Sequence, residues 1–513
     1  MASSSNQGAT LDISLVDISG QEITKGTWHG HCKAHDLFQA AYKSKPGFLC
    51  KLLRGSEELS PQSDLASLCH SFDHLTVVWM TGAGQEKQFV MHDAFAAVKS
   101  DGSVITWGDA DEGGDSSQVE HRLQEGVVQV IGNGVAFAAV KSDGSVVTWG
   151  DPSGGGNSFE VEHRLQECEG VVQVVGTGVA FAAVKSDGSV VTWGYADGGG
   201  DSSRAEHRLR EDVVQIVGTA GAFAAVKSDG SVITWGDAHE GGDSSRVEHR
   251  LQECVVQVVC NGVAFAAVKS DGSVITWGDA DGGGDSSRVE HRLQEGVVQI
   301  VGTAGAFAAV KSDGSVITWG DTNRGGNSSQ VEDRLQEGVV QVVGIVGAFA
   351  AVKSDGSVVT WGYADGGGNT SRVEHRLQEG VVQVVGISWA FAAVKSDGSV
   401  VTWGDADRGG GNSSRVEHQL QEGVVQVVGT GVAFAAVKSD GSVVTWGKSD
   451  EGGNSSSVEH RLQKGVVQVV GNRRAFAAVK SDGSVITWGD AASGGDSSRV
   501  EHRLQEGVIA VVS

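Results

Sequence analysis

Ala94-Phe-Ala-Ala-Val-Lys-Ser-Asp-Gly-Ser-Val-Ile-Thr-Trp-Gly108 is the stretch that decides the fold, because it recurs with almost no change to the end of the chain. The Asp-Gly pair within it lies between two β-rich runs, which predicts a β-hairpin with a two-residue type I′ turn. This turn predicts that Val98 lies opposite Ile105 and Ala96 opposite Trp107. Both faces of the hairpin are then apolar, so each hairpin must pack between neighbours.

The hairpin is the unit of an internal repeat. Ten copies stand 42 to 44 residues apart, and the Asp of each Asp-Gly pair marks one copy: Asp101, Asp143, Asp187, Asp229, Asp271, Asp313, Asp355, Asp397, Asp440 and Asp482. Gly contributes 76 of the 513 residues and Pro only 3. Because the Gly residues recur at a fixed period, they indicate a folded repeat array and not low-complexity sequence.

Each repeat continues beyond its hairpin with two further segments. In the first repeat these are Val119-Glu-His-Arg-Leu123 and Val127-Val-Gln-Val-Ile131, which follow a Gly-, Asp- and Ser-rich loop. The second segment is a clear strand. The first is either a strand or one helical turn, and we expect a strand because four-stranded blades are the common radial repeat.

The repeats resemble those of the regulator of chromosome condensation family over about 420 residues. Val213-Val-Gln-Ile-Val-Gly, Phe223-Ala-Ala-Val-Lys-Ser-Asp-Gly-Ser-Val and Thr234-Trp-Gly236 carry the resemblance. It implies a mainly β fold, a β-propeller over residues 94–513. These units are shorter than the usual blades of the family, and there are ten of them where the family's rings usually have seven.

The two ends of the array predict how the ring closes. The first hairpin follows only a weak strand candidate at 88–91, whereas two segments, 500–504 and 508–512, follow the last hairpin with no hairpin after them. Docking these C-terminal strands beside the first hairpin completes a blade and removes open sheet edges. An open superhelix and two smaller rings are the alternatives.

A different pattern precedes the array. Residues 1–10 are expected to be a disordered polar tail and 81–93 a linker. Between them, strands at 11–15, 23–28, 48–53 and 75–80 and a helix at 34–45 resemble the ubiquitin-like β-grasp family over about 70 residues (11–80). Because Met80 continues into more protein, we interpret this as a built-in ubiquitin-like α+β domain and not a conjugated modifier; another small α+β fold is the alternative.

Composition and charge restrict the classes of partner. The formal net charge of −25 disfavours nucleic acid, whose phosphates such an array repels. The six Cys residues form no Cys-x-x-Cys pair, as expected of reduced thiols in an intracellular protein. There is no secretory signal and no apolar run that could cross a membrane, so a cytoplasmic or nuclear location without membrane contact is expected.

Two recurring features could carry chemistry. A histidine recurs in nine of the ten copies of the Val-Glu-His-Arg-Leu segment, and this repetition indicates a surface role and no catalytic residue, since an active site needs one constellation. The loops offer weak calcium candidates, because carboxylates at alternate positions are typical of calcium loops. These candidates are Asp109, Asp111, Asp115, Asp279, Asp281 and Asp285.

The sequence favours a non-catalytic scaffold for protein–protein interaction, without a cofactor, in the ubiquitin pathway or in small-GTPase regulation. The alternatives are a guanine-nucleotide exchange factor, which family members are, and a calcium-binding repeat protein. Every loop after Trp-Gly leaves its blade at the same rim, which predicts an acidic face for a basic protein partner such as a small GTPase or a ubiquitin-pathway component. The residues predicted to bind this partner are Asp109, Asp111, Asp115, Asp237, Asp243, Asp279, Asp281, Asp285, Asp405 and Asp407.

Overall fold

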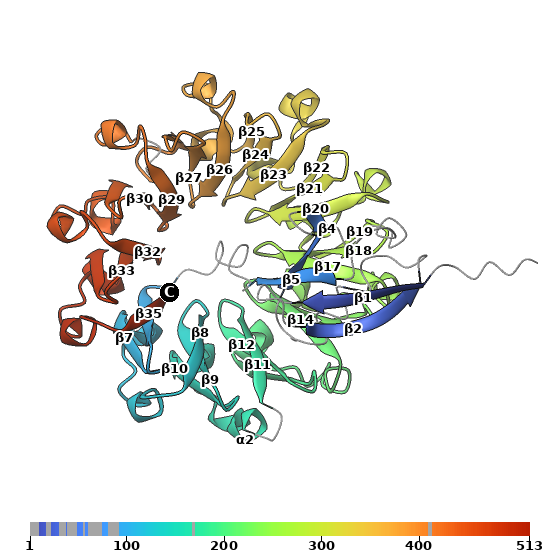
Figure 1. Ribbon diagram of the computed structural model, residues 1–513. Helices are drawn as coiled ribbons and strands as arrows, with labels where there is room; N and C mark the ends of the chain where they lie inside the picture. Colours follow the sequence, from blue (N-terminus) through green and yellow to red (C-terminus); the bar gives the residue numbers. More distant parts are fainter. Residues whose placement is uncertain are drawn as a thin grey trace, which may run out of the picture.

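The array folds into ten three-stranded antiparallel sheets, or blades, that stand side by side in a ring (Figure 1). The computed structural model describes residues 10–16, 22–29, 37, 49–54, 57–59, 74–80, 92–166, 170–408 and 413–513. Blade 1 is β35-β6-β7, blade 2 is β8-β9-β10, and blade 10 is β32-β33-β34. The fold is therefore mainly β.

Each blade has an inner, a middle and an outer strand, and Figure 1 shows the inner strands nearest the axis of the ring. The inner strands are β8 (Val127–Gly132), β11 (Val171–Gly176), β14 (Val213–Gly218), β17 (Val255–Cys260), β20 (Val297–Gly302), β23 (Val339–Gly344), β26 (Val381–Gly386), β29 (Val424–Gly429), β32 (Val466–Gly471) and β35 (Val508–Val512). The middle strands are β6 (Ala94–Lys99), β9 (Ala136–Lys141), β12 (Ala180–Lys185), β15 (Ala222–Lys227), β18 (Ala264–Lys269), β21 (Ala306–Lys311), β24 (Ala348–Lys353), β27 (Ala390–Lys395), β30 (Ala433–Lys438) and β33 (Ala475–Lys480). The outer strands are β7 (Val104–Gly108), β10 (Val146–Gly150), β13 (Val190–Gly194), β16 (Val232–Gly236), β19 (Val274–Gly278), β22 (Val316–Gly320), β25 (Val358–Gly362), β28 (Val400–Gly404), β31 (Val443–Gly447) and β34 (Val485–Gly489).

The hairpin forms as predicted, but its register differs by one residue. In blade 1, Val98 pairs with Val104 and Phe95 pairs with Trp107. The predicted pairing of Val98 with Ile105 was wrong. The observed register places the two aromatic rings on the same face, where they stack with centroids 5.3 Å apart.

The turn explains this register. Lys99 N–H donates to the carbonyl of Ser103 at 2.9 Å, which leaves three residues in the loop. Only Gly102 has a positive φ, 77°, so the turn is a type I turn followed by a left-handed residue and not type I′. Asp101 favours it because its Oδ1 accepts both the N–H and the hydroxyl of Ser103, at 2.9 and 2.7 Å.

The segment between blades is a helical turn, and the predicted fourth strand was wrong. In the first repeat, Arg122 N–H donates to the carbonyl of Val119 at 2.8 Å, and the side chain of Leu123 is fully buried. Leu123 N–H likewise donates to the carbonyl of Glu120 at 3.0 Å, and bonds between residues three apart close a 3-10 helical turn and are absent from a strand. The turns are η4 (Glu120–Arg122), η6 (Phe159–Val161) with α2 (Glu162–Leu165), η9 (Glu248–Arg250), η11 (Glu290–Arg292), η13 (Ser329–Leu335), η15 (Glu374–Arg376), η16 (Glu417–Gln419), η18 (Glu459–Arg461) and η20 (Glu501–Arg503).

An apolar core fills each junction between neighbouring blades. Between blades 1 and 2, for example, the middle-strand Ala94 and Ala96 of one blade pack against Phe137 and Trp149 of the next. The indole N–H of Trp149 also donates to the carbonyl of Gly113 in the loop of the preceding blade, at 2.9 Å. A Cβ at Gly113 would lie 2.7 Å from the Phe137 ring, so this loop position requires glycine.

The ring is closed, as the two ends of the array predicted. The C-terminal strand β35 pairs with β6 of the first hairpin, with Val511 opposite Ala97. Trp107 of that hairpin donates to the carbonyl of Gly494 in the last loop at 3.1 Å, and Val508 and Val511 are buried in the core shared with blade 10. These contacts exclude the open superhelix and the two smaller rings.

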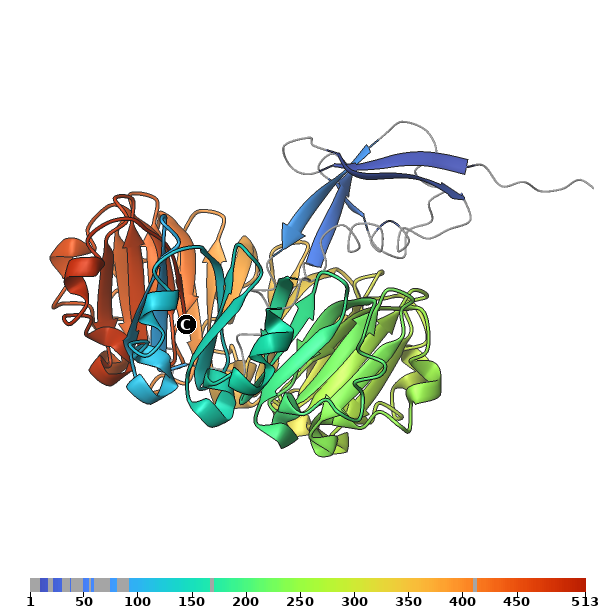
Figure 2. The same cartoon turned by 90° about the horizontal axis from the view of Figure 1, so that it is seen from below.

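The N-terminal part forms one mixed five-stranded sheet outside the ring (Figure 2). Its strands are β1 (Thr10–Val16), β2 (Glu22–His29), β3 (Leu49–Arg54), β4 (Glu57–Leu59) and β5 (His74–Met80). They lie in the order β2-β1-β5-β3-β4, with β1 and β5 parallel. Apart from Leu37, the helix predicted at 34–45 lies outside the described residues, as do residues 1–9 of the tail and 81–91 of the linker.

Candidate functional site

The loops that follow each Trp-Gly gather on one side of the ring, which we call the loop face. The turns between inner and middle strands lie on the same side: in blade 2, the amide of Asn133 in the turn donates to the carbonyl of Gly154 in the loop at 2.7 Å. The opposite side, the hairpin face, carries the Asp-Gly turns and the helical turns. The loops form short helical segments, which are η3 (Ala110–Gly114), η5 (Pro152–Gly156), η7 (Ala196–Gly200), η8 (Ala238–Gly242), η10 (Ala280–Gly284), η12 (Thr322–Arg324), η14 (Ala364–Gly368), η17 (Ser449–Glu451) and η19 (Ala491–Gly495).

Two of the loop aspartates hold the loop in shape. Asp109 Oδ1 accepts the N–H of Asp111 at 2.9 Å, and Asp115 Oδ1 accepts the N–H of Ser117 at 2.9 Å. The second bond lowers the pKa of Asp115 below its usual value. In blade 2 the same bond is made by Asn157 Oδ1, so the alternation of Asp and Asn at this position preserves an acceptor and not a charge.

A third group of aspartates, in the middle of the loops, has no such structural task. Their side chains are exposed, and among the described residues no hydrogen bond to their carboxylates is present. Their charge is therefore available to a partner without any loss of loop structure. They are Asp111, Asp197, Asp281, Asp365, Asp407 and Asp450.

The six calcium candidates do not come together as a cation site. Within the described part of the chain, no three side chains of Asp, Glu, His or Cys are grouped so that they could hold a metal ion. Like Asp109, Asp279 directs its Oδ1 to a backbone N–H, that of Gly282, at 2.6 Å, and Asp285 does so to Ser287. Two of the three aspartates in each loop therefore cap the backbone of that loop. They are Asp109 and Asp115 in blade 1 and Asp279 and Asp285 in blade 5, whereas Asp111 and Asp281 remain exposed.

Charge is distributed unevenly around the loop face. The loops of blades 1 to 5 (109–117, 151–159, 195–203, 237–245 and 279–287), which we call the acidic arc, contain no Lys or Arg. The remaining half carries Arg324, Arg408 and Lys448 in its loops and Arg473 and Arg474 in the turn of blade 10. Of the residues predicted to bind a partner, the arc contains Asp109, Asp111, Asp115, Asp237, Asp243, Asp279, Asp281 and Asp285. Within the arc, Asp243 and Asp285 lie near Arg246 and Arg288, which directly follow their loops, and outside it Asp405 and Asp407 lie beside Arg408.

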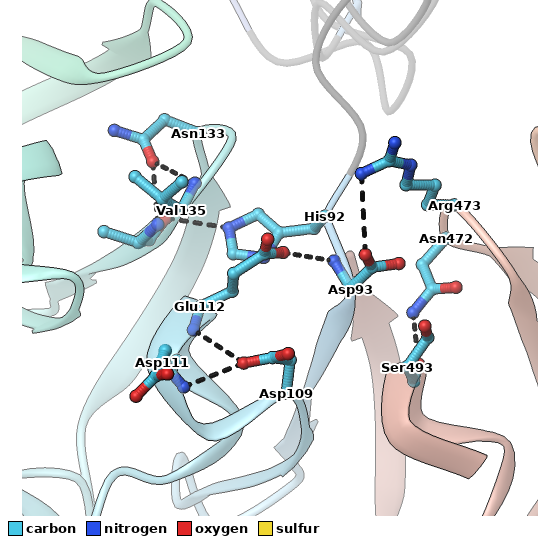
Figure 3. A network of polar contacts seen from close by, with 12 residues as sticks. His92, Asp93, Asp109, Asp111, Glu112, Asn133, Val135, Asn472, Arg473 and Ser493 are labelled. Atoms are coloured by element: carbon cyan, nitrogen blue, oxygen red, sulfur yellow. Dashed lines mark hydrogen bonds and ion pairs between the residues drawn. The ribbon is translucent and has the colours of Figure 1, made fainter. Parts of the chain in front are cut away.

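The arc begins at the seam where the first and last blades meet (Figure 3). Asp93 N–H donates to Glu112 Oε2 at 2.7 Å, and the Asp93 carboxylate lies 3.7 Å from the guanidinium of Arg473. The backbone N–H of Arg473 in turn donates to the carbonyl of His92 at 3.0 Å. The seam is therefore closed on the loop face by polar contacts as well as by strand pairing.

His92 is the residue that sequence reasoning missed at this seam. Its side chain is 2% exposed, stacks on Phe137 at 4.2 Å, and shares a hydrogen bond of 3.0 Å between Nε2 and the carbonyl of Ala136. Burial lowers its pKa to about 4, so the ring is neutral. The sequence analysis assigns His92 to the linker, but aligning His92-Asp93-Ala94 with Arg473-Arg474-Ala475 would have placed it in the first repeat.

The hairpin face carries a circle of ion pairs, the Arg–Glu circle. The arginine of each helical turn lies 2.9 to 4.0 Å from the glutamate of the next, and the pair Arg503–Glu120 joins the last blade to the first. Only Gln419 interrupts the nine links. The recurring histidines lie between these partners and are exposed: His121, His163, His207, His249, His291, His375, His418, His460 and His502.

Three comparisons relate the chain to known proteins. No protein-family model and no curated protein matches the chain. Human WBSCR16 matches 76% of this chain and 99% of its own, with 16% identity and a TM-score of 0.32. Yeast RCC1 (Prp20), solved bound to Kap60, matches 54% of this chain and 81% of its own, with 14% identity and a TM-score of 0.31. At these identities and TM-scores, both matches are distant similarities. Among its described residues, no helix is long and apolar enough to span a membrane.

Proposed function

We propose that the protein is a non-catalytic scaffold whose loop face binds a basic protein partner. The observation that carries this proposal is the acidic arc, where five consecutive nine-residue loops contain no Lys or Arg and the nearest arginines, Arg204, Arg246 and Arg288, directly follow three of them. Clustered like charges on a rigid support attract a cationic partner and speed its association. The closed ring holds the arc in a fixed shape, because strand pairing and apolar cores continue across the seam.

The N-terminal sheet supports a link to ubiquitin-pathway assembly. Its order β2-β1-β5-β3-β4 with parallel β1 and β5 is compatible with a ubiquitin-like β-grasp domain. Such a domain joined to an acidic ring would bring two partners together, one on each module. A small GTPase or another component of this pathway is the class of basic partner we propose.

The test compares charge changes on the two faces. Replacing Asp111, Asp197 and Asp281 by Asn removes three charges from the arc. The control replaces Asp355, Asp397 and Asp440 of the hairpin turns by Asn, which removes three exposed charges from the hairpin face and leaves an amide oxygen to accept the same backbone N–H. Proteins captured from a cell lysate by the parent and by each variant are then quantified by mass spectrometry. Basic partners should be depleted at least severalfold by the loop-face variant alone; equal depletion by the hairpin-face variant would show that net charge, and not the arc, recruits them.

Guanine-nucleotide exchange is the second candidate, since it belongs to the family that the repeats resemble. Exchange factors of that family insert a β-wedge from one blade, and the spacing of 42 to 44 residues leaves no room for one here. A nucleotide-release assay with small GTPases decides between the two functions. If catalytic amounts of the protein accelerate nucleotide release, the protein is an exchange factor and the scaffold proposal is wrong.

A further inference from the structure

An apolar collar lies at the inner edge of the ring, on the hairpin-face end of the inner strands. In blade 2 it is formed by Val128, which lies in a β-bulge between Val127 and Gln129. Seven collar residues are 40% to 63% exposed, and these seven are most of the large hydrophobic side chains exposed in the described part of the chain. The collar comprises Val128, Val172, Val214, Val256, Val298, Val340, Val382, Val425, Val467 and Ile509.

The fold does not require an apolar side chain at the exposed collar positions. The bulge leaves the residue without a paired neighbour on the middle strand, and the adjacent Val127 and Val130 supply the buried contacts instead. A serine would fit there without a cavity. All ten copies nevertheless carry Val or Ile. Seven of them are exposed, whereas Val172, Val214 and Val256 are half-buried, so the exposed apolar surface runs over blades 6 to 10, 1 and 2 and is of the kind that marks interaction sites.

Carboxylates surround the collar. Among the described residues, the residue two positions before the inner strand is exposed in nine blades; it is glutamate in eight of them, namely Glu125, Glu211, Glu253, Glu295, Glu337, Glu379, Glu422 and Glu506, and lysine at Lys464. Each of these side chains precedes the collar residue of its own blade by three positions along the chain. The collar is thus an apolar surface with an anionic border.

We propose that this collar binds a cationic amphipathic segment of another protein, in which apolar residues are flanked by Lys or Arg. The valines would bury the apolar side chains, and the glutamates would pair with the flanking cations. Two other occupants are disfavoured by charge. A second copy of this chain would place its own glutamate border against this one, and an anionic lipid surface would be repelled by the glutamates. The site lies on the face opposite the acidic arc, so it does not depend on the proposed function.

A defined peptide tests the collar. The probe is a fluorescent 18-residue peptide of Leu and Lys with helical amphipathic spacing, and its control has the same composition in scrambled order; binding is measured by fluorescence anisotropy. Replacing Val340, Val382 and Val425, all about 60% exposed, by Ser should weaken binding of the patterned peptide about tenfold or more, since each loses apolar contact. The scrambled peptide should bind weakly to both proteins.

Two further variants separate the faces. Replacing Glu337, Glu379 and Glu422 by Gln should weaken the patterned peptide severalfold, whereas the loop-face variant with Asn at 111, 197 and 281 should bind it like the parent. The proposal is overturned if the serine variant, with an unchanged melting temperature, binds the patterned peptide as the parent does. It is also overturned if the parent sediments as a dimer that the serine substitutions dissociate, because the collar then holds a second copy.

Discussion

The two faces of the ring are built from the same ten repeats, but one face is uniform and the other is not. On the hairpin face the Asp-Gly turn recurs in every blade and the Arg–Glu circle is interrupted only at Gln419. On the loop face the first loop residue is Asp109 in blade 1, Tyr195 in blade 3 and Lys448 in blade 9. The fold therefore tolerates change on the loop face, and this is where individual blades can be adapted to a partner.

The difference has a physical cause. On the hairpin face the arginines and glutamates of the helical turns also serve the junction to the next blade, as Arg122 does with Glu162 at 3.2 Å. On the loop face the junction depends on backbone atoms and glycines, such as the carbonyl of Gly113 that accepts from Trp149. Side chains at other loop positions, including Asp111, can vary without weakening the ring.

Opening the ring should have the largest effect on stability. Deleting residues 508–513 removes β35, exposes the edge of β6 and uncovers the core around Val508 and Val511, each worth about 1.5–3 kcal/mol when buried. The deletion should lower the free energy of unfolding by about 5 kcal/mol and reduce the melting temperature of the whole array. Ile509→Ser, an exposed change in the same strand, is the control. A deletion variant that melts like its parent would contradict closure by β35.

The hairpin turn offers the next largest effect. Gly272 has a φ of 77°, and a Cβ there would lie 2.5 Å from the backbone nitrogen of Gly296, so Gly272→Val should cost about 3 kcal/mol. Asp271 has no positive φ, so Asp271→Ala should cost only about 1 kcal/mol, through the lost bond to Ser273. Urea unfolding of the two variants measures the difference. Equal losses of unfolding free energy in the two variants would contradict this turn and support the type I′ turn, in which both residues need a positive φ.

Acid should weaken the loop-face seam through His92. Its pKa is about 4 in the folded protein and 6.5 ordinarily, so between these pH values the unfolded chain binds a proton that the folded chain does not. Stability is then complete above about pH 6.5 and falls by up to about 3 kcal/mol as the pH approaches 4. Burial raises the pKa of Glu112, which acts in the opposite direction.

The variant His92→Gln isolates this effect, because the amide can still donate to the carbonyl of Ala136 but has no titratable group. Denaturant unfolding at pH 7.5 and at pH 4.5, for parent and variant, gives the comparison. The parent should lose more stability than the variant over this interval. If both lose the same amount, His92 is not the neutral, buried group described here.

The smallest effect is expected on the hairpin face, where Gln419→Arg would complete the Arg–Glu circle with Glu459. The neighbouring pairs are about one-third to one-half exposed, as for Arg376 and Glu417, so a new pair should add no more than about 0.5 kcal/mol. The gain should vanish at high salt. Gln419→Met, which adds no charge, is the control; a gain equal to that of Arg would mean that packing, not charge, acts at this position.

The sequence predicted the features that recur in every repeat. It missed the features for which two local conformations suit the same residues. The strands, the ten copies and closure by 508–512 follow from periodicity, which ten repetitions make unambiguous. The turn was mistaken because Asp-Gly suits two turn types, and the choice depends on the bonds from Ser103 to Asp101. The helical turn ending at Leu123 was mistaken because a five-residue segment does not distinguish a strand from a helix.

The candidate site was predictable in position but not in its internal roles. The loops after Trp-Gly do lie on one face, as strand direction requires. Sequence could not separate Asp109, which caps the loop, from Asp111, whose carboxylate remains exposed, because that depends on the loop's backbone. It also could not show that His92 is buried, since the repeat pattern is incomplete before Ala94.

The association rate of a captured basic partner tests the central claim most directly, that the two faces differ and the acidic arc receives the partner. The rate constant is measured from low to physiological salt for the parent, for the loop-face variant with Asn at 111, 197 and 281, and for the hairpin-face variant with Asn at 355, 397 and 440. Only the loop-face variant should associate severalfold more slowly at low salt and show a weaker salt dependence. Unchanged rates for the loop-face variant, or equal slowing by both variants, would contradict this claim.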